Sequence, residues 1–451
     1  MDPASEVENR YKPLWPGYLA AYCNRFLVEG QVEFRFLNGR LEQQLETFRP
    51  DVVAIGGVSQ NFHHAARCAA ESKRNGAVVI IGGPHISALP SCLSEHMDIG
   101  CIGEGEQTFL ELMQTLLKKG EIALDGLRGV RGIVFHDGGT LSRTPSRPLV
   151  EKLDNIPHPD RSLVSAFQPH SYMFTSRGCP YRCVFCASSR FWKKVRFASA
   201  EYMLEEIEQL AEKGARTISF YDDLFAVNRH RLERLADLLS STGLNRHLRF
   251  TCNLRANVVT RDLVELLKQI NIVSIGMGLE SGSDRTLSFL KGNVTVAENG
   301  KAVKLLKEAG IQVNASFVIG SPDETEAEVM DTFRFIQNSN LDFVDTYVLT
   351  PLPGTPLWVF AAERGLVSED MDWSCLNVNF EYSWRKAVIV SEKLSRDDIR
   401  RLYGKFRRQR LYRIMKALPR SPWLSDVPRV VLGIALEKAR RFGRKLWRTG
   451  E

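Results

Sequence analysis

The sequence predicts an α/β protein made of two successive α/β units and a basic helical extension. Apolar runs of strand length alternate with amphipathic segments of helix length, first over residues 16–118 and again over residues 172–367. The stretch between the two units is rich in proline, and beyond about residue 371 the alternation stops. We therefore divide the chain into residues 1–125, 126–170, 171–370 and 371–451.

The first unit has the pattern of an open, doubly wound Rossmann-like layer, because short apolar runs ending in glycine are typical of buried parallel strands. Such layers bind ligands at the carboxyl ends of their strands, where glycine lets a large flat ligand approach the backbone. The glycines in this position are Gly56, Gly82, Gly83 and Gly103. The expected helices cover 16–26, 41–48, 62–75 and 107–118, and the expected strands cover 32–37, 52–57, 77–81 and 98–102.

The connector, residues 126–170, contains a predicted hairpin at 132–139, and Pro145, Pro148, Pro157 and Pro159 then mark an extended linker. The second unit then supplies six strand–helix repeats, which predict a partial (β/α)6 barrel with its chemistry at the carboxyl ends of the strands. The strands are expected at 172–175, 217–221, 248–252, 272–277, 313–319 and 342–348, and the helices at 200–213, 229–240, 262–269, 296–309 and 325–338.

Three cysteines follow the first strand of this unit with the spacing C-x3-C-x2-C: Cys179, Cys183 and Cys186. Three thiolates on one short loop can hold three irons of a [4Fe–4S] cluster and leave the fourth iron open to a ligand. A closed zinc site needs a fourth ligand, and no other Cys or His lies nearby in sequence. The alternatives are a structural metal loop or three buried thiols. The six remaining cysteines are scattered singly and are expected to be small buried side chains.

With Phe185 directly before the last cysteine, this motif resembles that of the radical S-adenosylmethionine (radical SAM) superfamily. Further matches follow in order: Gly278-Leu279-Glu280-Ser281-Gly282 with Leu290-Lys291-Gly292, then 316–323, then the turn Pro353-Gly354-Thr355-Pro356. The resemblance implies that SAM binds the open iron and that an electron from the cluster cleaves it to a 5′-deoxyadenosyl radical.

The resemblance also implies roles for single residues. Asp222 and Asp223 would bind the amino group of SAM, and Arg255 would reach the SAM carboxylate or a substrate acid; the alternative is that these charged groups are simply solvated. Glu280 and Ser281 would face the ribose or methionine part, while Val318 and Gly320 would lie at the adenine. The family usually has Gly and Glu where this chain has Ser316 and Asp323, with Glu324 adjacent, so single roles in that loop are open.

The first unit resembles the cobalamin-binding domain that precedes many radical SAM cores, through Pro50-Asp51-Val52-Val53, Gly82-Gly83-Pro84-His85 and Gly103-Glu104-Gly105-Glu106. The resemblance implies that cobalamin is a further cofactor. Two features depart from the family pattern: the usual first strand is missing, and so is the Asp-x-His-x-x-Gly loop that supplies a cobalt ligand. His63, His64 and His85 could ligate a metal, but no spacing supports this. The alternative is an α/β layer kept for packing or for substrate contact.

The extension is basic: residues 385–451 hold 20 Lys and Arg against 6 Asp and Glu, in a chain with a net charge of +7. Helices are expected at 394–413, with an apolar stripe, and at 430–447. A basic amphipathic helix can lie on an anionic membrane, or it can pack on the core. No nucleic-acid module accompanies the charge. The sequence has no secretory signal, no long apolar run and an odd number of cysteines, which predicts a cytoplasmic protein. Peripheral membrane contact through the basic extension is the alternative.

These features predict a cobalamin-associated radical SAM enzyme that modifies, by C-methylation, an unactivated carbon of a lipid, isoprenoid, tetrapyrrole or other secondary metabolite. The expected partners are a small, apolar substrate and an electron donor such as flavodoxin or ferredoxin. Cyclisation, carbon–carbon coupling and oxygen insertion are alternative outcomes for the same radical. A non-catalytic iron–sulfur partner protein is the alternative from another class. A methylthiotransferase is disfavoured, because neither its N-terminal cysteine set nor its RNA-binding module is present.

Overall fold

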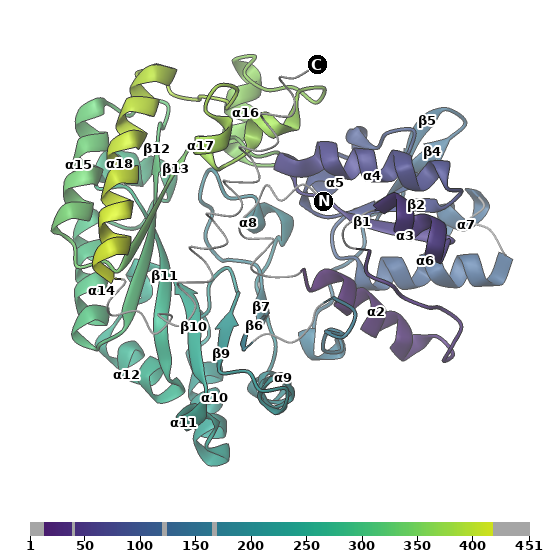
Figure 1. Ribbon diagram of the computed structural model, residues 1–451, viewed down its shortest axis with the longest axis horizontal. Helices are drawn as coiled ribbons and strands as arrows, with labels where there is room; N and C mark the ends of the chain where they lie inside the picture. Colours follow the sequence, from purple (N-terminus) through teal and green to yellow (C-terminus); the bar gives the residue numbers. More distant parts are fainter. Residues whose placement is uncertain (1–12, 38–40, 120–123, 165–168, 418–451) are drawn as a thin grey trace, which may run out of the picture.

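The computed structural model describes residues 13–37, 41–119, 124–164 and 169–417 of the 451-residue chain. Two α/β units lie side by side, and the small sheet next to the three-cysteine loop lies between them (Figure 1). The predicted fold class, a Rossmann-like layer followed by a partial barrel, is confirmed.

The first unit is a five-stranded sheet in the order β1-β2-β3-β4-β5. The first three strands are parallel, and β4 and β5 continue the sheet as an antiparallel hairpin. Its elements are α2 (Trp15–Phe26), α3 (Leu41–Phe48), β1 (Val52–Gly56), α4 (Phe62–Arg74), β2 (Val78–Gly82), α5 (Pro84–Ala88), β3 (Ile99–Cys101), α6 (Glu106–Lys119), α7 (Leu124–Gly129), β4 (Ile133–Asp137) and β5 (Thr140–Arg143). The hairpin predicted within the connector therefore forms, and the structure attaches it to β3.

The strand predicted over residues 32–37 is wrong. This segment has no regular secondary structure and belongs to no sheet, and β1 is the edge strand of the sheet. An extended segment becomes a strand only when a neighbouring strand supplies its backbone hydrogen bonds. Residues 32–37 and residues 50–56 line the same cavity instead of pairing. The apolar alternation is present in the sequence, but no neighbouring strand pairs with this segment.

The second unit is a six-stranded, fully parallel sheet in the order β13-β12-β11-β10-β9-β6, with helices on its outer face (Figure 1). The strands are β6 (His170–Met173), β9 (Thr217–Phe220), β10 (Arg249–Leu254), β11 (Ile272–Glu280), β12 (Gln312–Ile319) and β13 (Phe343–Val348). The helices of this unit are α9 (Ala200–Glu212), α10 (Arg229–Thr242), α11 (Leu244–His247), α12 (Arg261–Ile270), α13 (Asp284–Leu290), α14 (Val296–Glu308), α15 (Glu326–Asn338) and α18 (Arg396–Ala417).

Side-chain alternation along the central strands keeps the inner face of the barrel open. On β11, Ile275, Met277 and Leu279 are buried in the core beneath the helices. Gly276 and Gly278 point the other way and are partly exposed. A Cβ at Gly276 would lie 2.4 Å from Asn253 Oδ1, so glycine is required where β10 and β11 approach each other. The inner face is thus lined with small and polar groups that leave room for a ligand.

Helix positions follow from local capping. Thr325 is the N-cap of α15, as predicted: its hydroxyl accepts from Glu328 N–H, and the Glu328 carboxylate accepts from Thr325 N–H. Thr295 and Glu298 form the same capping box at the start of α14. Such reciprocal bonds satisfy backbone donors that the helix leaves unpaired.

Helix α18, the first helix of the basic extension, packs against the barrel beside α15 (Figure 1). Ile399, Leu402 and Phe406 of its predicted apolar stripe are at most 2% exposed and belong to the barrel core. Leu411 of the same stripe is 51% exposed. This helix thus takes the place after β13 where the sixth helix of the barrel would lie. None of the described helices has the length and apolar character needed to cross a bilayer. The second predicted helix, at 430–447, lies outside the described residues.

The two units share one hydrophobic cluster. Phe62, Ile86 and Met97 of the first unit are buried with Trp358 and Trp373, which follow the barrel strands in sequence. The intervening segment carries α16 (Pro356–Glu363) and α17 (Phe380–Ser383). Because this apolar surface is buried by both units, their relative position is fixed by packing as well as by the chain.

Gly83→Ala should destabilise the first unit. Gly83 has a φ of +108°, and a Cβ there would lie 2.6 Å from the Gly57 carbonyl oxygen. The strain is expected to cost about 1–3 kcal/mol, and thermal unfolding followed by circular dichroism would show a lower midpoint. Gly129→Ala is the control, because no atom lies within 4 Å of its Cβ position. Equal midpoints for the two variants would contradict the prediction.

Candidate functional site

The three cysteines lie on one loop between β7 (Ser176–Arg177) and α8 (Ser188–Phe191), and all three are partly exposed. The pKa of the Cys179 thiol is raised to about 11, first by burial and then by the nearby Asp223, Cys186 and Cys183. Burial also raises the pKa of Cys183, whereas Lys291 and Arg255 lower it. The loop therefore brings the thiols close to one another and places two cations beside the middle one.

A cluster site and a single-ion site require different arrangements of ligands. Among the described residues, no three His, Cys, Asp or Glu side chains converge on one point where a single metal ion would sit. In a cubane cluster each thiolate binds a different iron, so the three sulfur atoms need to surround the cluster without meeting at one point. Three thiols from an eight-residue loop with no fourth ligand fit the predicted open [4Fe–4S] site.

The adjacent aspartates at the end of β9 have different environments. Asp222 is 1% exposed. Its carboxylate accepts from Thr175 N–H at 2.6 Å and from Ser176 N–H at 3.1 Å, and it lies 4.0 Å from the Arg231 guanidinium. Asp223 is exposed and accepts from Ser188 Oγ at 2.5 Å. Asp222 therefore holds the start of the cluster loop, whereas the carboxylate of Asp223, near Cys179, remains accessible from the surface.

Arg255, Lys291 and Glu280 form a charged group next to Cys183. Arg255 Nη1 lies 3.6 Å from Cys183 Sγ, its Nη2 donates to the Gly292 carbonyl at 2.6 Å, and the guanidinium stacks 3.9 Å from the Tyr181 ring. Lys291 Nζ lies 3.7 Å from Glu280 Oε1. The sequence identifies Lys291 only as part of a motif and does not predict its position beside Glu280 and Cys183. Arg255 is thus in contact with the cluster loop itself.

Glu280 is aimed into the barrel by its backbone. Its φ is +64°, and the pairing of β11 with β12 shifts register between Gly278 and Glu280. A bulge of this kind redirects a side chain that regular alternation would place elsewhere. A Cβ at Gly278 would lie 2.2 Å from Glu280 Oε1, so Gly278 makes room for the carboxylate. Burial raises the pKa of Glu280, and Lys291 opposes the increase.

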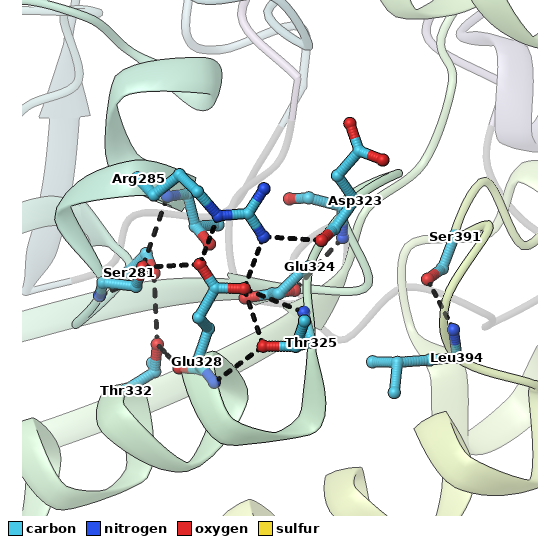
Figure 2. Close-up of polar contacts among 12 residues, drawn as sticks. Ser281, Arg285, Asp323, Glu324, Thr325, Glu328, Thr332, Ser391 and Leu394 are labelled. Atoms are coloured by element: carbon cyan, nitrogen blue, oxygen red, sulfur yellow. Dashed lines mark hydrogen bonds and ion pairs between the residues drawn. The ribbon is translucent and has the colours of Figure 1, made fainter.

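Ser281 and Glu324 are both buried, and their polar contacts with the protein lie within the region drawn in Figure 2. Ser281 is fully buried; its hydroxyl bonds to Thr332 Oγ1 at 3.2 Å and accepts from Ser283 N–H. Glu324, 1% exposed, accepts from Gly320 N–H at 2.6 Å and from Ser321 N–H at 3.1 Å. Asp323 is exposed, so Glu324 is the residue that shapes the glycine turn after β12. Val318 is 7% exposed at the end of the same strand.

A cavity of about 1550 Å³ lies between the two units. Its wall in the first unit is largely apolar and includes Trp15, Phe34 and Val53. Its other wall comes from β13, from the segment around α17 and from α18; this wall includes Tyr221 and Tyr347 at strand ends of the barrel. The volume exceeds the roughly 300–1,000 Å³ of pockets for drug-sized ligands. The cavity therefore suits a large ligand that contacts both units.

Comparisons with known proteins agree with this geometry. Residues 173–336 match the family model described as the radical SAM superfamily, and residues 3–113 match the B12 binding domain. An uncharacterized methyltransferase of Pyrococcus horikoshii is 31% identical over 80% of both chains. The anaerobic magnesium-protoporphyrin IX monomethyl ester cyclase of Cereibacter sphaeroides is 26% identical over 93% of this chain and 70% of its own. The methyltransferase TsrM of Kitasatospora setae, at 18% identity, shares the fold with a TM-score of 0.68 over 80% of this chain and 73% of its own.

The chain belongs to the radical SAM superfamily. It carries a B12 binding domain ahead of the radical SAM core, and its cofactors are a [4Fe–4S] cluster, SAM and cobalamin. The protein is therefore an enzyme, and the alternative of a non-catalytic iron–sulfur partner is set aside.

The predicted glycines of this radical SAM enzyme's B12 binding domain do not share one role. Gly56 lines the cavity, and a Cβ there would meet the Trp15 ring at 2.9 Å. Gly82 and Gly83 do not line it; Gly83 instead allows its loop to approach Gly57. Gly103, with a φ of +84°, has open space where a Cβ would be.

The three histidines named in the sequence lie in two different environments. His63 and His64 line the cavity. His85 is fully buried between the Phe62 and Trp373 rings, and its Nδ1 bonds to Ser59 Oγ at 3.0 Å. Burial lowers the pKa of His85 to about 4, so its imidazole is neutral at physiological pH. Its position in the shared core makes it a packing residue.

The two aspartates should respond differently to the same substitution. Asp223→Asn should keep the fold and weaken SAM binding by about ten-fold, because a charge-assisted bond becomes a neutral one. Asp222→Asn should lower the free energy of unfolding by about 1–3 kcal/mol, because the amide NH2 group that replaces Oδ2 cannot accept from the Thr175 hydroxyl and no longer offers a negative charge to Arg231. Calorimetric SAM titration and thermal unfolding would separate the two effects. A stable Asp222→Asn variant with weakened SAM binding would reverse the assignment.

Glu324 should make stability depend on pH. Burial raises its pKa from 4.5 to about 7. Between these values the unfolded chain has released a proton that the folded protein keeps, so stability falls as pH rises through this window and levels off above about pH 7. The thermal midpoint should therefore fall less between about pH 5 and pH 8 in Glu324→Gln than in the unaltered protein. Parallel curves for the two proteins would contradict the prediction.

Proposed function

We propose that this enzyme methylates an unactivated carbon of a large, flat and mainly apolar small molecule, with a tetrapyrrole as the first substrate class to test. The observation that carries the proposal is the cavity between the B12 binding domain and the barrel. It supplies an apolar wall from one side and two tyrosines from the strand ends of the other. Relatives are named as a methyltransferase and as a tetrapyrrole cyclase, which supports both the reaction and the substrate class.

The residues around the cluster loop have separate tasks in this proposal. Cys179, Cys183 and Cys186 would hold the cluster. Reduced cluster and SAM together supply a radical that removes a hydrogen atom from carbon, and cobalamin supplies methyl transfer, with a second SAM as the methyl source. Asp223 would accept a hydrogen bond from the SAM ammonium group, and Glu280 with Lys291 would bind its polar atoms.

The adenine and the substrate would be held by other parts of the barrel. The backbone at Val318, next to the turn that Glu324 and Gly320 shape, would contact the adenine. Tyr221 and Tyr347 would stack on or flank the substrate, because aromatic rings present an apolar face and a polar hydroxyl. Arg255 and Ser281 would act through the loops they hold. A low-potential donor such as flavodoxin or ferredoxin would reduce the cluster.

Ring closure is the second candidate, because the relative that matches 93% of this chain is a cyclase. The same radical would then form a carbon–carbon bond within the substrate, and no methyl group would be added. A cytoplasmic location is part of the proposal. Membrane contact would depend on residues 430–447, since the apolar stripe of α18 is largely used in packing.

The decisive experiment is an anaerobic reaction of the reconstituted holoenzyme with dithionite, hydroxocobalamin, CD3-labelled SAM and a panel of porphyrins, isoprenoids and lipids. We expect 5′-deoxyadenosine together with a product in which one CD3 group replaces a hydrogen. Cys183→Ala is the control and should lose both. 5′-Deoxyadenosine with an unlabelled cyclised product would favour the second candidate. Absence of 5′-deoxyadenosine from a cluster-loaded enzyme would contradict both.

A further inference from the structure

Four charged side chains connect the B12 binding domain to the base of the cluster loop. Glu104 and Glu106 come from the loop after β3 and the start of α6. Arg177 is the last residue of β7, and Arg196 is the first residue of β8 (Arg196–Phe197). We call these four residues the interdomain charge cluster.

Glu104 is the centre of the interdomain charge cluster. Arg177 Nη1 donates to Glu104 Oε1 at 2.6 Å, and Arg196 Nη1 donates to both Glu104 oxygens at 2.9 and 2.8 Å. Arg177 Nη2 donates to Glu106 Oε1 at 2.6 Å. The connector joins the same group, because Val150 N–H donates to Glu104 at 2.8 Å and its carbonyl accepts from Arg196 at 2.6 Å. Both carboxylates and both guanidinium groups are therefore paired.

These ion pairs are shielded from water, so the loss of one partner is costly. The side chains of Glu104, Glu106 and Arg196 are at most 7% exposed, and that of Arg177 is 13% exposed. The Arg177 guanidinium also lies 5.8 Å from the Tyr18 ring centroid and 5.4 Å from that of Trp192. Two positive and two negative charges cancel within this group, so removal of one leaves an uncompensated charge away from water.

The segment that the interdomain charge cluster holds is not part of either large sheet. Strands β7 and β8 have two residues each and pair only with each other, with Arg177 opposite Arg196. An isolated two-stranded ribbon is marginally stable at best. Arg177 lies two residues before Cys179, and between them a Cβ at Gly178 would lie 2.6 Å from the Lys194 carbonyl oxygen. A shift of Arg177 is therefore passed directly to the first cysteine of the loop.

We propose that Glu104, Glu106, Arg177 and Arg196 are positioning residues that fix the cluster loop to the B12 binding domain, and so set where the cluster and SAM lie relative to cobalamin. This inference rests on the family and its cofactors, and it does not depend on the methylation reaction or on the substrate class. Its test uses no substrate, so its failure is distinct from failure of the proposed function.

The test compares Glu104→Gln with Glu151→Gln in the full-length, cluster-loaded protein. Glu151 of the connector pairs with Lys194, which lies between β7 and β8. The two side chains are 73% and 47% exposed, so this pair is expected to contribute little to stability. We expect Glu104→Gln to speed hydrogen exchange in peptides covering residues 174–187 by about ten-fold or more while β11 and β12 stay unchanged. Its dithionite-reduced cluster should show a broadened or weaker SAM-induced change in the EPR spectrum. Glu151→Gln should match the unaltered protein in both measurements.

A milder variant keeps the proposal testable if Glu104→Gln does not fold. Glu106→Gln removes one partner of Arg177 and leaves Glu104 paired with both arginines, so we expect a smaller change in the same direction. Exchange that rises equally across the whole barrel would show a contribution to stability alone and would overturn the proposal. An unaltered SAM response of the cluster in folded variants would overturn it as well.

Discussion

The common direction of the six barrel strands is the constraint on which this structure depends. Parallel strands end at one edge, so residues more than a hundred positions apart meet there without any local signal. Arg255 illustrates the result, since it follows β10 and contacts both Cys183 in the cluster loop and the Lys291 carbonyl after α13. The first sheet contributes its edge strand β1 to the cavity, which lies where the two units face each other.

Burial decides how similar residues are used within this arrangement. Asp222 and Asp223 are neighbours in sequence, yet one carboxylate is consumed by Thr175, Ser176 and Arg231 while the other remains exposed beside Cys179. Desolvation raises the pKa of both carboxyl groups, and hydrogen bonds from the protein oppose the increase in each case. A carboxylate that the protein encloses holds structure, whereas an exposed carboxylate remains accessible to a ligand. The same distinction separates Ser281, within its network, from Glu280, which the bulge turns inward.

The cavity lies along the edge strand of the first unit. Residues 32–37 and β1 both line it and form no ladder with each other, so this edge of the sheet is open to a ligand. At the other boundary of this unit, Glu104 pairs with Arg177 and Arg196 and joins the unit to the base of the cluster loop. One side of the interface is thus open and apolar, and the other is tightly paired and polar.

The sequence by itself determined the order and type of nearly all elements, the cluster cysteines and the family, because these follow from periodicity, local capping and spacing within one short loop. Thr325 and the three cysteines carry their signals within a few residues. Only the tertiary structure decided that residues 32–37 form no strand, that α18 completes the barrel, and that Asp222 is buried while Asp223 is exposed. It also decided the partners of Glu104 and Arg177, since hydrogen bonding and burial between distant segments depend on how the two units pack and leave no periodic trace in the chain.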